Sequence, residues 1–123
     1  MYIFSGKVIK GEGRGVKIGF HTANLDNTSL SLNYGVYLAE VNVGNKIHKG
    51  LLHFGPQKTF NNKITAEVYI KDFDSKIYGE KLKVMAVKKI RRIKKFKNIK
   101  SLTKQIEKDL AFLNQKSKEI HNS

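Results

Sequence analysis

Short alternating segments separated by turn residues fill most of the chain, and this pattern constrains the fold more than any other feature. The segments near residues 2–9, 35–43, 46–54, 63–71 and 81–92 are rich in Val, Ile, Tyr and Leu, and clusters of Gly, Asn and Asp divide them. Such runs are typical of short strands joined by tight turns. The pattern therefore predicts a mainly β protein, a closed antiparallel barrel of Greek-key type with about six strands.

The period of the apolar residues changes after Phe96. From there they are spaced by four, four and three positions, at Leu102, Ile106, Leu110 and Leu113. This spacing places them along one face of a helix, for which Asn98 is a suitable N-cap. We therefore expect one C-terminal helix packed on the barrel. Residues 114–123 lack a sustained apolar pattern, and we expect them to fray.

Length and composition indicate one domain. A chain of 123 residues has room for one hydrophobic core, so we expect a single domain over residues 1–123 with its core in residues 2–113. The chain contains no Cys, which excludes disulfides, thiolate metal sites and a thiol nucleophile. The first apolar stretch of the chain ends at Ser5. This stretch is too short for a signal peptide or a membrane span. We expect a cytoplasmic, monomeric protein that does not associate with membranes.

Positive charge is concentrated in the last third of the chain. The whole sequence has 24 Lys and Arg against 10 Asp and Glu, a net charge of +14. Residues 76–123 hold 15 of the basic residues and four of the acidic ones, and residues 88–100 hold eight basic residues and no acid. Such a stripe can bind nucleic acid nonspecifically through its phosphates. It also suits a solvated face that keeps the protein soluble, or the attraction of an anionic nucleotide, and the three interpretations stay open.

Three glycines on alternate positions open the segment of greatest functional interest. Gly11, Gly13 and Gly15 allow backbone conformations that are closed to other residues, and they can turn successive amides toward one anion. Arg14 and Lys17 add positive charge in the same segment. The segment therefore predicts a phosphate site, although the same glycine spacing also occurs in ordinary hairpin bends.

Two short oxygen-bearing side chains, Thr22 and Asn24, end this segment. Hydroxyl and amide oxygens are hard ligands that suit Mg²⁺, which usually shares the phosphates of a substrate. On an extended segment the alternate positions place both side chains on one face. The pair therefore predicts a magnesium site, and a turn capped by the same side chains is the competing interpretation.

The segment from Gly11 to Leu25 resembles the glycine-rich loop and Pro-Thr-Ala-Asn motif of riboflavin kinases, including the kinase module of bacterial FAD synthetases. His21 stands where the family has proline. The resemblance covers roughly residues 5 to 113. It continues at Gly35-Val36-Tyr37, which resembles the opening of a family strand, and at residues 55–60, which resemble a Gly-x-x-Pro-Thr-Phe loop.

One further block supports this resemblance, and two further positions depart from it. Residues 67–74, followed by Tyr78-Gly79, are similar to the Glu-Val-His-Leu-x-Asp-Phe block of the family. Lys58 replaces the proline of the preceding loop, and Ile93 replaces a usual glutamate near the C-terminal strand. Because proline stiffens a loop, its absence at His21 and Lys58 leaves more freedom to lose on closing, so we expect activity to be weakened.

The resemblance implies transfer of the γ-phosphoryl of ATP to the 5′-hydroxyl of riboflavin, which gives FMN and ADP and depends on Mg²⁺. Glu67 matches the catalytic carboxylate of the family, which would take the proton of the hydroxyl. Thr22 and Asn24 would hold Mg²⁺ together with ATP, and Arg91 and Phe96 would contact the flavin. By the same resemblance, the residues that would bind ATP are Gly11, Gly13, Arg14, Gly15, Lys17, Thr22 and Thr59.

Two other functional classes remain open. One is a binding module, a basic barrel that holds flavin, nucleotide or RNA without chemistry, and the other is a regulatory pseudokinase domain. The departures at His21, Lys58 and Ile93 and the basic C-terminal part of the chain favour the binding module. The His-x-Gly-His motif of the nucleotidyl-transfer half of FAD synthetases does not occur in the sequence, so we expect any reaction to stop at FMN.

Overall fold

A computed structural model of the chain describes residues 1–10, 22–58, 62–71, 73 and 76–122, with side chains described as far as Leu113. Within these residues it contains six strands and one helix. The elements are β1 (Tyr2–Ile9), β2 (Thr22–Leu25), β3 (Gly35–Val43), β4 (Lys46–Pro56), β5 (Ile64–Ile70), β6 (Lys81–Arg91) and α2 (Ile99–Asn122).

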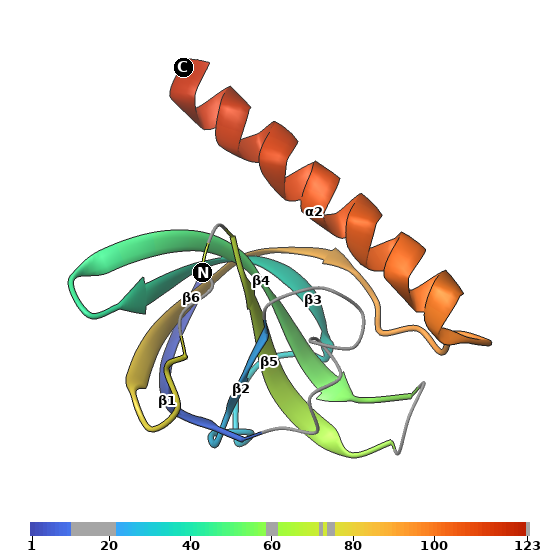
Figure 1. The fold of residues 1–123 in the computed structure, drawn as a ribbon, viewed down its shortest axis with the longest axis horizontal. Helices are drawn as coiled ribbons and strands as arrows, with labels where there is room; N and C mark the ends of the chain where they lie inside the picture. The colour runs from blue at the N-terminus through green and yellow to red at the C-terminus, as the bar shows by residue number, and fades with distance from the viewer. Residues whose placement is uncertain (11–21, 59–61, 72, 74–75, 123) are drawn as a thin grey trace.

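The six strands form a closed antiparallel barrel (Figure 1). Around the barrel they follow the order β1-β2-β5-β4-β3-β6. Strands β3, β4 and β5 follow one another as neighbours, and β6 returns to pair with β3, which is the connection of a Greek key. The predicted fold class, a mainly β Greek-key barrel with a C-terminal helix, is therefore confirmed.

Strand alternation explains how the barrel obtains its core. On β5, Ala66, Val68 and Ile70 are at most 4% exposed and belong to the central cluster, whereas the residues between them are half-buried. Because successive strand side chains point to opposite faces, the intervening residues Glu67 and Tyr69 lie on the outer wall. Glu67, the candidate base, therefore lies on the outside of the barrel, next to the packed core.

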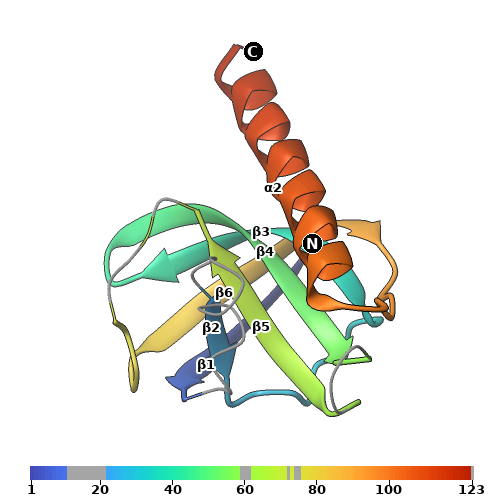
Figure 2. The same ribbon diagram turned by 45° about the vertical axis from the view of Figure 1, so that its right-hand side comes forward.

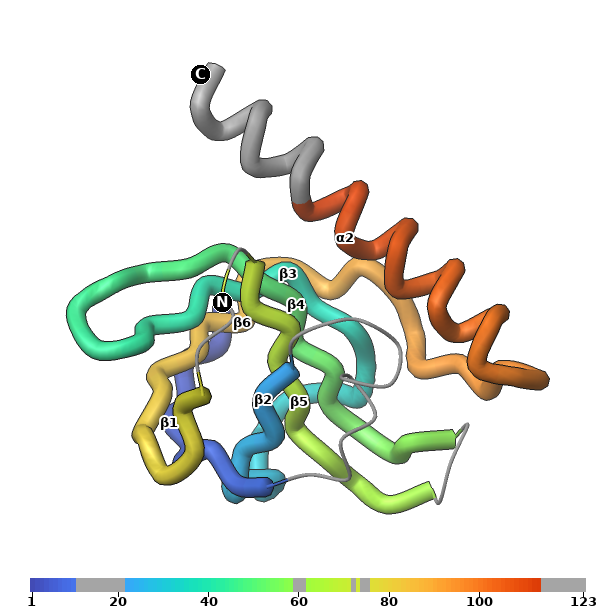
Figure 3. Tube along the Cα trace, viewed as in Figure 1, coloured from blue at the N-terminus to red at the C-terminus, as the bar shows by residue number. Residues whose placement is uncertain are grey.

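Two turns use residues that tolerate a positive φ angle. Gly44 has a φ of 61° and turns the β3–β4 hairpin (Figure 3). Asn62, between β4 and β5, has the same φ of 61°. An Asn side chain adopts this left-handed conformation more readily than most. Strand β5 runs back along β4, so that His53 lies opposite Glu67.

The first part of helix α2 lies against the outside of the barrel beside β4 (Figure 2). The Asn98 side chain accepts a hydrogen bond from the Ser101 amide at 2.9 Å, which confirms the predicted N-cap. The helix runs to Asn122, and the expected fraying of residues 114–123 stays a prediction. Within the described residues, no helix is long and apolar enough to cross a membrane. A second apolar cluster joins the helix to the outer wall: Leu38, Leu51, Tyr69, Ile90, Leu110, Phe112 and Leu113.

The junction between β1 and β2 is the narrowest in the described barrel. These strands pair at Val8 with Leu25 and at Ile9 with Asn24, whereas β2 pairs with β5 along its whole length. Strand β2 has four residues and follows the glycine-rich segment, and it was not among the segments expected to be strands. A four-residue segment shows too few alternations for its period to be recognised.

Candidate active site

Strand β2 presents Thr22 and Asn24 on the outer wall. Ala23 and Leu25 are 3% and 2% exposed and pack in the core, whereas Thr22 and Asn24 are half-buried. Because side chains alternate along a strand, the two oxygen-bearing side chains share the outer face. They stand at successive outward positions of one short strand.

Glu67 lies directly beside Asn24. The two are paired residues of the antiparallel β2–β5 ladder, and Thr22 is paired with Tyr69 in the same ladder. Directly opposed residues bring their Cβ atoms to about 4.5–5.5 Å. The structure therefore brings the candidate base and both candidate magnesium ligands together on one patch of the outer wall.

The carboxylate of Glu67 receives hydrogen bonds from two neutral side chains. Gln57 donates from Nε2 to Oε2 of Glu67 at 3.3 Å and also to Oγ1 of Thr65 at 2.9 Å. Tyr69 forms a side-chain hydrogen bond with Glu67. Burial raises the pKa of the Tyr69 hydroxyl well above its usual value, and the charge of Glu67 and this hydrogen bond raise it further. Tyr69 therefore stays protonated and acts as the donor.

Sequence reasoning did not assign a role to Gln57 or Tyr69. The period of a strand could have placed Tyr69 on the face of Glu67, because the two residues are two positions apart. The contact of Gln57 depends on the path of the chain around the β4–β5 turn. There the Gln57 amide donates to the Lys63 carbonyl at 2.9 Å, and its carbonyl accepts from the Asn62 amide at 2.9 Å.

On the other side of Glu67, His53 is its paired residue on β4. Burial, followed by the positive charge of Arg91, lowers the pKa of His53 from 6.5 to about 4. The imidazole is therefore neutral near pH 7. Its Nδ1 is buried and makes no hydrogen bond within the described part of the chain. His53 thus adds a neutral side chain, not a cation, beside the candidate base.

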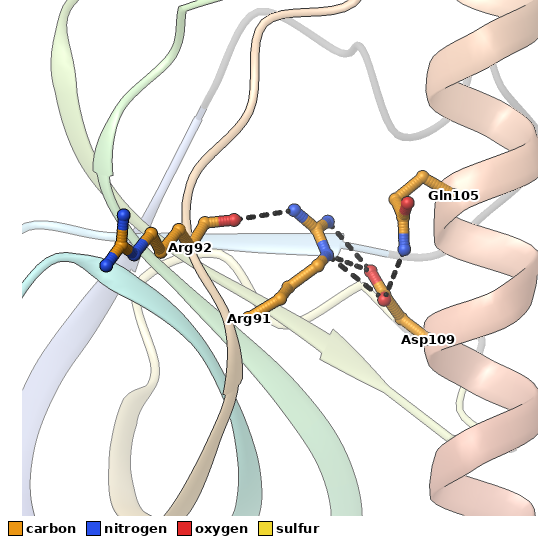
Figure 4. Close-up of polar contacts among 4 residues, drawn as sticks. All are labelled: Arg91, Arg92, Gln105 and Asp109. Carbon is orange, nitrogen blue, oxygen red and sulfur yellow. Dashed lines mark hydrogen bonds and ion pairs between the residues drawn. The ribbon is translucent and has the colours of Figure 1, made fainter.

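A buried ion pair ties the end of β6 to the helix (Figure 4). Arg91 donates from Nη2 to Asp109 at 2.8 Å and from Nε to both carboxylate oxygens at 3.1 Å. Gln105 donates to the same carboxylate at 3.0 Å. The side chains of Arg91 and Asp109 are only 13% and 6% exposed. The interaction fixes the helix on the wall near His53.

The two residues expected to contact a flavin lie at this end of β6. Arg91 is engaged by Asp109 and also donates from Nη1 to the Arg92 carbonyl at 3.1 Å. Phe96 is half-buried in the connection between β6 and α2. In the structure Arg91 therefore links β6 to the helix through Asp109. Flavin binding by Arg91 or Phe96 stays a prediction.

The remaining predicted phosphate contacts lie outside the described residues: Gly11, Gly13, Arg14, Gly15, Lys17 and Thr59. The described ends of both segments nevertheless border the site. Ile9, just before the glycine-rich segment, pairs with Asn24, and Asn24 in turn pairs with Glu67. Gln57, just before the second segment, donates to Glu67. The described residues that precede both segments therefore lie near the candidate base.

The donor set near Glu67 suits a magnesium ion shared with a nucleotide. No group of three His, Cys, Asp or Glu side chains within the described ranges could hold a metal ion. Thr22 and Asn24 supply neutral oxygens, which are of the type that Mg²⁺ takes, and leave most of its coordination positions to phosphate and water. The residues therefore fit the predicted metal.

A basic surface extends from the end of β6 along the exposed side of α2. We use this name for the nine exposed basic residues Lys88, Lys89, Arg92, Lys94, Lys95, Lys97, Lys100, Lys104 and Lys108. The buried side of the helix holds Ile106 and Asp109 at 2% and 5% exposure. Because Asp109 pairs with Arg91 and Ile106 is packed inward, the helix turns Lys100, Lys104 and Lys108 toward solvent.

Comparison with known proteins finds matches over most of the chain. Residues 1–116 match the family model described as Flavokinase: Riboflavin kinase. Over 113 residues the chain is 39% identical to the RNA-binding riboflavin kinase RibR of Bacillus subtilis. This match covers 90% of this chain and 49% of that protein. It is 40% identical over 114 residues to the bifunctional riboflavin kinase/FMN adenylyltransferase of the same organism, with coverage of 88% and 36%.

A solved structure shares the fold. A protein from Streptococcus pneumoniae, named as a macrolide-efflux protein, superposes with a TM-score of 0.80 at 30% identity. The match covers 91% of this chain and 38% of that one. The chain therefore spans about half or less of the length of each of these proteins.

Proposed function

This chain belongs to the riboflavin kinase family, and on that premise we propose that it transfers the γ-phosphoryl of ATP to the 5′-hydroxyl of riboflavin in a Mg²⁺-dependent reaction. The observation that carries the proposal is the pairing of Glu67 with Asn24 on one outer face, with Thr22 beside them. A carboxylate next to two neutral oxygen ligands suits phosphoryl transfer, which needs a proton acceptor and a bound metal–nucleotide complex.

In the proposed reaction Glu67 orients the 5′-hydroxyl of riboflavin and accepts its proton. The hydroxyl oxygen forms a bond to the γ-phosphorus as the bond from that phosphorus to the β–γ bridging oxygen breaks, and ADP leaves with the electron pair. Thr22 and Asn24 would hold a magnesium ion that neutralises charge on the phosphates. His53 supports this scheme, because its neutral ring does not pair with the carboxylate that must take the proton.

The departures from the family sequence bear on rate more than on this arrangement. His21 and Lys58 stand in place of prolines, in or next to segments outside the described residues. Ile93 removes a carboxylate close to Arg91, but Asp109 already pairs with that guanidinium. We propose a functional enzyme whose substrate loops lose more conformational freedom on closing than those with proline.

A direct assay tests the proposal. Purified protein with radiolabelled ATP, riboflavin and Mg²⁺ is expected to form FMN, and Glu67→Gln is expected to lower kcat about a hundredfold or more while riboflavin still binds. Glu40→Gln is the matched control, because Glu40 is an outer-wall carboxylate that pairs with Lys49 at 2.7 Å, on β3 and β4. No FMN from the folded wild-type protein, or wild-type rates from Glu67→Gln, would refute the proposed activity.

A second candidate function is nonspecific contact with nucleic acid through the basic surface. Residues 88–108 contain these nine exposed basic residues and one exposed acidic residue, Glu107. The relative RibR is named as RNA-binding. Neutralised phosphates release counterions, so such binding weakens as salt increases. The alternatives are solubility alone and attraction of ATP.

Fluorescence anisotropy with a labelled single-stranded RNA separates these alternatives. The triple variant at Lys94, Lys95 and Lys97, each changed to Gln, is expected to bind more weakly, with the salt slope reduced by about one for each lost phosphate contact. The control changes three exposed lysines elsewhere, Lys46, Lys76 and Lys81, to Gln. Equal loss in both variants would show that only net charge matters and would refute a site on the basic surface.

A further inference from the structure

Tyr34 presents an exposed aromatic ring just before β3. The side chain is 50% exposed, and its ring meets Phe54 edge-on, with the ring centroids 5.3 Å apart and the planes at 71°. A single exposed aromatic residue is common on protein surfaces, but this one lies against the backbone of Gly55. A Cβ at Gly55 would stand 3.0 Å from both Cβ and Cγ of Tyr34. Because Gly55 also has a φ of 139°, the position favours glycine, and Tyr34 lies where another side chain would be.

This ring lies on the same outer wall as the candidate base. In the β4–β5 ladder Gly55 is paired with Thr65, and His53 is paired with Glu67. Paired residues share a face of a sheet, and so do residues two positions apart on one strand. The place that a Cβ of Gly55 would take, which Tyr34 borders, is therefore on the face of Glu67. Two strand spacings across and two residues along separate Tyr34 from Glu67, which is about 12 Å.

The geometry of phosphoryl transfer fixes the direction in which riboflavin extends. The attacking and leaving oxygens lie roughly in line with the phosphorus. Thr22 and Asn24, the proposed ligands of the metal–nucleotide complex, are on β2, on one side of β5, so ADP leaves on that side. A riboflavin that presents its 5′-hydroxyl to Glu67 then lies on the opposite side, over β4 and β3. Because the ribityl chain separates this hydroxyl from the flavin ring, the ring reaches the part of the wall where Tyr34 lies.

Tyr34 is also next to the end of β6. Arg91 is paired with Val36, two residues after Tyr34. A Cβ at Gly35 would stand 3.1 Å from the carbonyl oxygen of Arg91, so the two backbones approach closely at this point. The residue expected to contact the flavin is therefore a neighbour of the exposed ring.

Hydrogen bonds hold the segment before Tyr34 on the barrel. The hydroxyl of Tyr37 donates to the Asn33 carbonyl at 2.6 Å, and the Ser31 amide donates to the hydroxyl of Tyr2 at 3.0 Å. A side chain on a segment held in this way loses little conformational freedom when a ligand binds. The ring of Tyr34 is thus preorganised for a flat ligand.

We propose that Tyr34 is the platform on which the isoalloxazine ring of riboflavin stacks, so that the ligand lies along the outer wall from Glu67 over β4 to the start of β3. The flavin ring is planar and aromatic, and such a ring stacks well on an aromatic side chain. The direction of the ligand rests on the proposed kinase reaction, whereas stacking on Tyr34 can be measured without turnover.

Fluorescence titration of riboflavin without ATP tests the stacking, because an aromatic side chain stacked on a flavin quenches its emission. Tyr34→Leu keeps an apolar contact with Phe54, and circular dichroism checks that it folds. It is expected to weaken the binding of riboflavin and of lumiflavin, the same ring without the ribityl chain, each about tenfold, and to leave the bound flavin more fluorescent. Tyr34→Phe keeps the ring and is expected to bind like the wild type. Tyr78→Leu is the matched control, because Tyr78 is 62% exposed between β5 and β6, and it is expected to leave flavin binding unchanged.

Wild-type affinity and quenching in Tyr34→Leu would refute the platform. Weaker binding of ADP with unchanged binding of riboflavin would also refute it, because the ring would then serve the adenine base. If the wild type forms FMN while Tyr34→Leu binds riboflavin normally, the kinase function stands and the platform is refuted. If riboflavin stacks on Tyr34 but the wild type forms no FMN, the platform stands and the kinase function is refuted.

Discussion

Removing Asp109 is expected to destabilise the protein strongly, because it leaves the Arg91 charge buried without a partner. The two side chains are 13% and 6% exposed, and Arg91 makes three hydrogen bonds to the carboxylate. Breaking one side of a buried pair costs about 3–5 kcal/mol. Gln105 also loses its acceptor. We therefore expect Asp109→Ala to lower the free energy of unfolding by at least about 3 kcal/mol.

Urea unfolding followed by circular dichroism measures this loss, provided that the slope of unfolding against urea stays constant. Glu40→Gln is the control, since the Glu40–Lys49 pair is 31% and 33% exposed and is expected to contribute less than about 1 kcal/mol. The double variant Arg91→Met with Asp109→Leu removes both charges and is expected to recover most of the stability. A cost for Asp109→Ala no greater than that for Glu40→Gln would refute the buried-pair argument.

Three further predictions follow from the same wall of the barrel. Because the folded pKa of His53 is about 4 and its ordinary value is 6.5, the unfolded chain takes up the proton first as the pH falls. Stability is therefore expected to drop by about 3 kcal/mol between pH 6.5 and 4, and pH-dependent unfolding of His53→Asn should lack this part of the slope. In Gly50→Ala the new Cβ would collide with the Tyr69 carbonyl, so urea unfolding is expected to show a loss of about 1–3 kcal/mol. Thr22→Ala with Asn24→Ala is expected to raise the Mg²⁺ concentration for half-maximal FMN formation at least about tenfold, which corresponds to 1.4 kcal/mol of binding, and an unchanged requirement would exclude these two as ligands.

Much of the fold could be predicted from local patterns. The alternation at residues 35–43 predicts β3 with its observed bounds, and Asn98 identifies the start of the helix because capping depends on a few neighbouring residues. Strand β2 was missed because its four residues follow a glycine-rich segment. Its pairing with β5 depends on the closure of the barrel, which no local pattern contains.

The candidate site divides in the same way. Glu67, Thr22 and Asn24 could be selected from motifs, and strand alternation places Thr22 and Asn24 on one face. The position of Glu67 beside them depends on the pairing of β2 with β5. The ion pair of Arg91 with Asp109 joins residues on different elements, so charge patterns along the chain did not reveal it. The same is true of Gln57, whose contact with Glu67 requires the β4–β5 turn. Contacts that depend on three-dimensional closure were the ones that sequence reasoning could not find.

Among the described residues, the narrow junction between β1 and β2 places the least paired part of the barrel at the proposed reaction site. In the described residues these strands meet at Val8 with Leu25 and at Ile9 with Asn24. Amide protons of β2 are therefore expected to exchange with solvent at a lower free energy than those of β4, which pairs with a neighbour along both edges. Opening at this junction would move Asn24 and would also uncover Val8 and Leu25 of the core cluster, so local opening is expected to act on the proposed site at a lower free energy than global unfolding.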